Sequence, residues 1–242
     1  EATHLERRAQ VAEMLNGPAS AVEQWLAVGE RALANNQYKA AQTALFRVLD
    51  SAADENKHKA TREAARKALI KALEELEWQH LAAQLKQDKL PAAWERTWFE
   101  KFFNNPADDR AAKITQAREG LAFAQTNGGD GHALVAMSLS KLGTRLRAYK
   151  STPEEDQEGK ALLLKALAVA EDADDPTKLM YDSLLMHVVE QLGNLEPETL
   201  ELKQKLLKRL RKRYDDTHEI VITTRFEIGQ ILALKRKYEE AD

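Results

Sequence analysis

The chain has 242 residues, a net charge of −3, 43 % apolar and 31 % charged residues, and no cysteine. This composition excludes a disulfide scaffold, a thiolate zinc site, an iron–sulfur cluster and a cysteine nucleophile, and the acidic balance excludes a polycation that binds nucleic acid along its whole length. No apolar run approaches the ~18 residues of a membrane-spanning helix. Because the chain begins with Glu1, we interpret it as a fragment with any targeting segment outside it. Because it stops at Asp242, at the start of a predicted second helix, we expect further repeats or another domain to follow.

Apolar residues recur with a helical period along the whole chain, which predicts an all-α fold. The short loops between the predicted helices indicate antiparallel neighbours. The best strand pattern, Ile220–Thr224, has no partner strand nearby, and a last helix begins at Tyr238. Helices are predicted near 3–15, 20–34, 38–53, 58–75, 77–88, 91–103, 106–126, 131–149, 154–171, 176–192, 197–213 and 218–235.

Prolines mark the predicted helix starts. Proline follows a capping residue at Asn105-Pro106, Thr152-Pro153 and Asp175-Pro176, and Glu196-Pro197 is a weaker start of the same kind. Thr152 and Glu155 have the spacing of a capping box, in which each side chain satisfies a backbone N–H of the other residue.

Three glycines lie inside predicted helices, where each costs about 1 kcal/mol relative to alanine and therefore needs a structural reason. Gly143 and Gly229 are 86 residues apart, which is two steps of 43, and Gly29 and Gly143 are 114 apart, which is three steps of 38. The 43-residue step predicts a further repeat centred on Leu185 and Met186. The surrounding patterns are Trp25-x-x-Val28-Gly29-x-x-Ala32, Leu139-x-x-Leu142-Gly143-x-x-Leu146 and Ile228-Gly229-x-x-Leu232.

These patterns, followed by Tyr38-x-x-Ala41 and by Tyr238-x-x-Ala241, resemble the tetratricopeptide repeat, and the long steps resemble the repeats of kinesin light chain and its bacterial relatives. Leu45 stands where that family more usually has an aromatic residue. The resemblance implies an α-α superhelix, a solenoid of about five antiparallel helix pairs plus a truncated last repeat. Residues 1–21 would form an N-terminal helix or cap, and residues 22–242 the repeats of a single domain.

The resemblance also implies a concave groove lined by the first helix of each pair. The mixed apolar and acidic side chains of the first repeat suit an extended or helical segment of a partner protein with apolar anchors and some positive charge. Leu26 and Glu30 do not match the Lys and Asn clamp that holds C-terminal carboxylates, so we do not expect chaperone tails to bind. The predicted partner-binding residues are Leu26, Glu30, Leu33, Met137, Ser140, Thr144, Arg147, Phe226 and Gln230.

Aromatic residues crowd one short predicted helix. Trp94, Trp98 and Phe102 share one face, and Phe99 lies on the adjacent face. One interpretation is a core between repeats, and the other is a patch that binds a partner.

A basic helix at residues 203–213 is the second unusual feature, with seven Lys or Arg in eleven residues. Lys205, Lys208, Arg209 and Lys212 are its candidate binding residues for an anionic surface or nucleic acid. The alternative is a solvated face whose basic last turn suits the helix dipole. Because the rest of the chain is acidic, we favour intramolecular or protein partners over nucleic acid.

No catalytic motif is present in the sequence, and the six histidines lack metal-ligand spacing, so we predict neither an enzyme nor a metal or cofactor. The leading hypothesis is a protein–protein interaction scaffold within a larger signalling or regulatory protein. The alternatives are a ligand-sensing regulatory domain of a kinase or transcription regulator, and anionic-surface or nucleic-acid binding through the basic helix. We expect a cytoplasmic location, with the periplasmic side of a membrane-anchored parent as the alternative.

Overall fold

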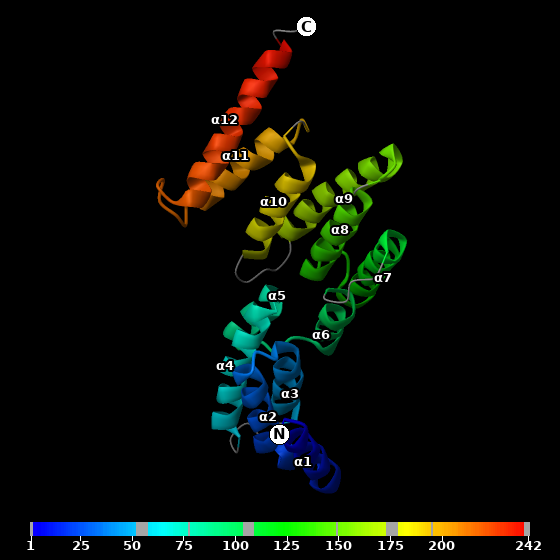
Figure 1. Cartoon of the computed structure of the whole chain (residues 1–242), viewed down its shortest axis with the longest axis vertical. Coiled ribbons are helices and arrows are strands. Elements are labelled where there is room, and N and C mark those ends of the chain that lie inside the picture. The colour runs from blue at the N-terminus through cyan, green and yellow to red at the C-terminus, as the bar shows by residue number, and fades with distance from the viewer. Residues whose placement is uncertain are drawn as a thin grey trace. The chain divides into compact units, whose positions relative to one another are not determined.

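The computed structural model describes residues 2–51, 58–76, 78–103, 109–148, 150–172, 179–194 and 196–239, and all regular structure in them is helical (Figure 1). This confirms the all-α prediction. None of the described helices combines the length and apolarity needed to cross a bilayer. The described residues contain twelve α-helices: α1 (Ala2–Asn16), α2 (Val22–Ala34), α3 (Tyr38–Ser51), α4 (Lys59–Glu75), α5 (Gln79–Lys86), α6 (Ala93–Trp98), α7 (Arg110–Gly128), α8 (Ala133–Leu146), α9 (Pro153–Asp172), α10 (Leu179–Leu192), α11 (Thr199–Leu210) and α12 (Glu219–Glu239).

The chain divides into two compact units, Glu1–Arg96 and Thr97–Asp242, which we call unit 1 and unit 2 and describe separately. In both units, helices that follow one another in the sequence pack as antiparallel neighbours. These mostly sequential contacts are consistent with a helical array, and the solenoid remains a prediction. A single repeat domain over residues 1–242 remains a prediction.

In unit 1, the packing of α2 against α3 gives Gly29 its structural reason. A Cβ atom on Gly29 would lie 2.5 Å from the Leu45 side chain, so the glycine is what lets α3 approach α2. Trp25 and Leu45 are buried in this pair. The buried residues Leu81 and Leu85 of α5 follow the buried Ala41 and Leu45 of α3 by 40 residues.

In unit 2, α8 and α9 cross at two glycines. A Cβ atom on Gly143 would lie 2.7 Å from the carbonyl oxygen of Gly159, which places the two backbones in direct contact. The 43-residue step also appears in the core, because Ser138, Tyr181 and Thr224 follow one another at this interval in α8, α10 and α12 and all three are buried. Leu185, on which the predicted further repeat is centred, lies in α10, and the repeat itself remains a prediction.

The start of α9 confirms the predicted capping box. The backbone N–H of Glu155 donates to Thr152 Oγ1 at 3.2 Å, and the N–H of Thr152 donates to Glu155 Oε2 at 2.9 Å. The Glu196-Pro197 start precedes α11, which begins at Thr199. The other two predicted starts, Asn105-Pro106 and Asp175-Pro176, lie outside the described residues.

The predicted helix start at Tyr238 is wrong, because α12 continues without interruption to Glu239. The segment after Leu234 contains neither glycine nor proline and is rich in residues that favour helix, so no signal ends α12 earlier. The candidate strand Ile220–Thr224 is the first part of the same helix, in which Val221 and Thr224 are buried.

Two other predicted helices differ in detail. Segment 91–103 is α6 followed by a π-helical turn, η2 (Phe99–Phe103). Segment 197–213 is α11, which buries Lys203, Leu206 and Leu210 and leaves Tyr214 exposed in the following turn. Tyr214 follows Leu210 by four residues, but α11 ends at Leu210, so Tyr214 is not part of its apolar face.

Candidate interaction surfaces

The predicted partner-binding residues of α2 lie in unit 1. Glu30 is exposed, and Leu26 and Leu33 are half-buried. On the same helix, Glu23 Oε1 accepts a hydrogen bond from Thr61 Oγ1 of α4 at 2.6 Å. This bond connects the first helices of two successive pairs, which are the helices that the sequence analysis expects to lie side by side.

In unit 2, the predicted residues of α8 are engaged in internal contacts. Ser140 is buried. Thr144 Oγ1 donates to the carbonyl oxygen of Ser140 at 2.9 Å and lies 2.9 Å from His187 Nε2 of α10. Arg147 forms ion pairs with Asp156 at 2.9 Å and Glu196 at 3.5 Å. These contacts give Thr144 and Arg147 structural roles between neighbouring elements.

The predicted residues with the greatest exposure in unit 2 belong to α12. Phe226 is 65 % exposed, which is unusual for a phenylalanine, and Gln230 is exposed one turn later. Met137 of α8 is half-buried. Among the predicted partner-binding residues, Phe226 is therefore the large apolar side chain that is exposed to solvent and accessible to a partner protein.

The aromatic residues near the start of unit 2 pack mainly against α7. Trp98 is buried, and its indole N–H donates to the carbonyl oxygen of Gly120 at 3.0 Å. Phe99 is buried edge-on to Trp98, with ring centres 5.1 Å apart. Phe102 is half-buried against Gly120, and Trp94 of unit 1 is half-buried. The burial of Trp98 and Phe99 favours the core interpretation over a partner-binding patch.

Lys141 is a residue that the sequence analysis did not single out. Its Nζ donates to the carbonyl oxygens of Phe102 and Phe103, the latter at 2.8 Å, and lies 5.3 Å from the centre of the Phe103 ring. Burial, with a smaller contribution from the charge of Arg145, lowers the pKa of Lys141 to about 8. Its position among the apolar residues of α8 is the signal that could have identified it.

The basic helix is largely neutralised by acidic residues of unit 2. Lys205 and Arg209 also lie over the ring of Tyr181, at 5.4 and 4.7 Å from its centre. Lys208 and Lys212 are exposed and make no ion pair with a described residue. The ion pairs are Lys203–Glu227, Lys205–Glu171, Arg209–Asp182, Arg211–Asp216 and Arg213–Asp182.

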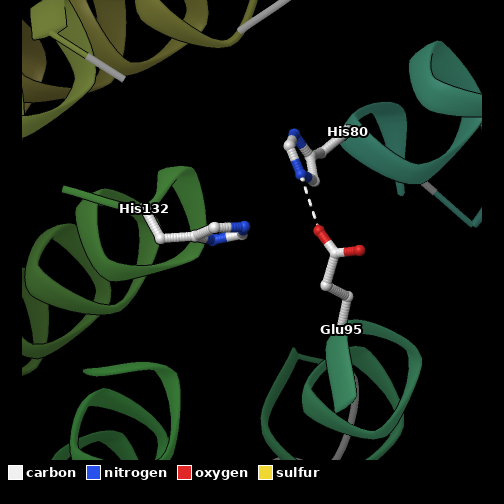
Figure 2. A group of neighbouring side chains, drawn as sticks. All are labelled: His80, Glu95 and His132. Atoms are coloured by element: carbon white, nitrogen blue, oxygen red, sulfur yellow. Dashed lines mark hydrogen bonds and ion pairs between the residues drawn. The ribbon is translucent and has the colours of Figure 1, made fainter. Parts of the chain in front are cut away.

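A buried polar group connects α5 and α6 in unit 1. His80 Nε2 lies 3.2 Å from Glu95 Oε1, as the dashed line in Figure 2 shows. The same carboxylate oxygen accepts from Gln84 Nε2 at 2.8 Å, and Glu95 Oε2 accepts from the backbone N–H of Ala92 at 2.7 Å. These bonds satisfy both carboxylate oxygens of Glu95, as expected for a buried carboxylate with a structural role.

Unit 1 also has a pocket of about 300 Å³ between the end of α3, the first half of α4 and the loop after α5. Arg66 is paired with Asp88 at its edge. The pocket is lined by four cationic residues and two acidic ones. The cationic residues are Lys59, Arg62, Arg66 and Lys89, and the acidic residues are Glu63 and Asp88.

The chain matches no protein-family model and no curated protein sequence.

Proposed function

We propose that the chain is an interaction module of tetratricopeptide-like helix pairs. In this proposal, a peptide or helical segment of a partner protein binds along the first helices of the pairs, and the module is part of a larger signalling or regulatory protein. The proposal contains no catalytic step and no cofactor.

The exposure of Phe226 is the observation that carries the proposal. A phenylalanine side chain contributes a large apolar area, and leaving it in water forfeits about 1.5–3 kcal/mol of burial energy. The Phe226 ring lies on the face of α12 opposite to the buried residues Val221 and Thr224. An exposed aromatic side chain of this kind is a typical anchor at protein–protein interfaces.

Site-specific photocrosslinking tests the proposal. The photoreactive analogue p-benzoylphenylalanine would replace Phe226, and in a matched control it would replace Tyr214, another exposed aromatic residue of unit 2. We expect a discrete covalent adduct with a partner protein from cells of the source organism at position 226 and not at position 214. Equal adducts at both positions, or none at position 226, would contradict the proposal.

The pocket of unit 1 favours ligand sensing as a second candidate function. Four cationic side chains around about 300 Å³ would suit a small anion. Thermal unfolding with and without inorganic pyrophosphate tests this, because a ligand that binds only the folded chain raises its melting temperature. A shift that disappears in Lys59→Ala and Lys89→Ala would support sensing, and an unchanged melting temperature would count against it.

A further inference from the structure

The turn after α5 contains a residue that local rules disfavour. Asp88 has a φ of 64°, its N–H donates to the carbonyl oxygen of Leu85 at 3.1 Å, and the N–H of Lys89 donates to that of Gln84 at 2.9 Å. This is the Schellman pattern that ends a helix, and its left-handed position usually holds glycine or asparagine. The same pair of bonds closes α2, where the position holds Asn36 with a φ of 56°.

A carboxylate at this position is unfavourable for a second reason. The negative charge of Asp88 lies at the C-terminal end of α5, which is the negative end of the helix dipole. Asp88 pairs with Arg66 of α4, but its side chain is 83 % exposed, and an exposed ion pair adds little to stability. Residues that break local rules without a gain in stability are typical of functional sites, so Asp88 needs a reason other than folding.

The pocket of unit 1 supplies such a reason, because Arg66 and Asp88 both line it. Helix α4 packs against α3 and α5, and its pocket residues Lys59, Arg62 and Arg66 are spaced three and four residues apart, on one side of the helix (Figure 1). The Arg66 guanidinium is suited to a carboxylate, which it can bind through two parallel hydrogen bonds. The Asp88 carboxylate occupies the position that a bound carboxylate would take.

The charges around the pocket favour an anion. Lys59 and Lys89 are exposed and form no ion pair with a described residue. Glu63 and Asp88 are the acidic residues of the lining, so its four cationic side chains leave an excess of positive charge.

The pocket also has an apolar part, which an inorganic anion would leave without a partner. Leu49 of α3 and Leu85 of α5 line it and are buried, and Leu90 of the loop after α5 lines it with 46 % of its surface exposed. A ligand with an apolar chain would remove part of this leucine surface from water, which is favourable. A volume of about 300 Å³ suits a small ligand.

We propose that the pocket binds an ionised carboxylic acid with an apolar chain, and that the carboxylate of the ligand replaces that of Asp88 at Arg66. The chain of the ligand contacts Leu49, Leu85 and Leu90. The exchange of partners costs little, because Asp88 is exposed and stays hydrated after it leaves Arg66. This inference rests on ligand sensing, the second candidate function, and names the class of ligand.

Calorimetric titration of the full chain with octanoate tests the proposal. Acetate has the carboxylate without the chain, and octylamine has the chain with the opposite charge, so the two are matched control ligands. We expect saturable binding of octanoate at neutral pH, binding of acetate weaker by about tenfold or more, and no detectable binding of octylamine. Pyrophosphate, which contacts only the cationic side chains, should bind more weakly than octanoate.

Variants of the pocket locate the site. Arg66→Gln should weaken octanoate binding by about tenfold or more, and Leu90→Ser should weaken binding of octanoate but not of acetate. Asp88→Asn should strengthen octanoate binding by about threefold or more, because it removes the competing carboxylate and keeps the turn, as Asn36 does after α2. Lys67→Gln is the matched control, since Lys67 is an exposed cation of α4 outside the pocket lining, and its binding should stay within about twofold of wild type.

The proposal is overturned if acetate or octylamine binds as tightly as octanoate, if Arg66→Gln leaves octanoate binding unchanged, or if Asp88→Asn fails to strengthen it. Circular dichroism and thermal unfolding establish that each variant is folded. If pyrophosphate binds and octanoate binds no better, ligand sensing stands and this proposal falls. If neither anion binds to the wild-type chain, ligand sensing falls with it.

Discussion

Thr144 and His187, 43 residues apart, hydrogen bond to each other across α8 and α10 at 2.9 Å. Because Thr144 Oγ1 donates to the carbonyl oxygen of Ser140, its lone pairs accept from His187 Nε2–H. The interval between the two residues equals the step between Gly143 and Met186. The bond therefore connects two positions that the predicted 43-residue step makes equivalent.

Removing the Thr144 hydroxyl should destabilise unit 2. Thr144→Val keeps the shape of the side chain but leaves the half-buried Nε2–H of His187 without its acceptor. We expect a loss of about 1 kcal/mol in the free energy of unfolding, measured by urea denaturation. Thr144→Ser, which keeps the hydroxyl, is the control and should lose less than Thr144→Val.

Acid should lower the stability that the half-buried His187 contributes, because the protonated imidazole is a charge that burial disfavours. Burial lowers the pKa of His187 below its ordinary value of 6.5, and Glu190 only partly opposes this. Below pH 6.5 the unfolded chain therefore binds more protons than the folded one, so the stability contributed by neutral His187 is complete above pH 6.5 and is lost as the pH falls. The difference in unfolding free energy between wild type and His187→Gln should shrink on acidification, and a pH-independent difference would contradict this assignment.

The glycines of α8 and α12 should respond in opposite directions to the same substitution. Gly143→Ala forces a methyl group against the backbone of Gly159 and should cost about 1–3 kcal/mol or more. Gly229→Ala meets no described atom of another element and should stabilise the chain by up to about 1 kcal/mol, because alanine favours helix. Thermal unfolding of the two variants checks this, and a loss of stability in Gly229→Ala would show that another element does cover that face.

The features predicted correctly from the sequence are those that depend on residues close together in the chain. The capping box at Thr152 was predicted, because it depends on residue type and short spacing. The sequence also showed that glycines inside helices need a structural reason, which close approach of the next helix supplies at Gly29 and Gly143, whereas no described atom of another element lies close to Gly229. The end of α12 was not predicted, since the resemblance of Tyr238 to a second-helix residue overrode the absence of a breaker. Intramolecular partners for the basic helix were favoured from the acidic balance of the rest of the chain, but the particular ion pairs were not predicted, because Lys205 and Arg209 pair with acidic residues from distant parts of the sequence.

Lys141 should give unit 2 a characteristic stability profile at alkaline pH. Its pKa is lowered to about 8 by burial and by Arg145, from an ordinary value of 10.5. Between these values the unfolded chain binds more protons than the folded one, so stability rises with pH, and the penalty of the buried charge is complete below about pH 8. Relative to Lys141→Met, the wild-type chain should gain stability from pH 8 to pH 10.5. A parallel profile of the two proteins would contradict the lowered pKa.

The basic helix should bind polyanions only when its internal partners are removed. Asp182 is buried and pairs with both Arg209 and Arg213, so Asp182→Ala releases two cations at once. We expect a loss of about 1–3 kcal/mol in the free energy of unfolding and stronger, salt-sensitive retention on heparin. Asp216→Ala is the control, because it releases only Arg211 from an exposed pair and should change retention less. Strong heparin binding by the wild-type chain, lost in Lys208→Glu together with Lys212→Glu, would instead support the nucleic-acid alternative.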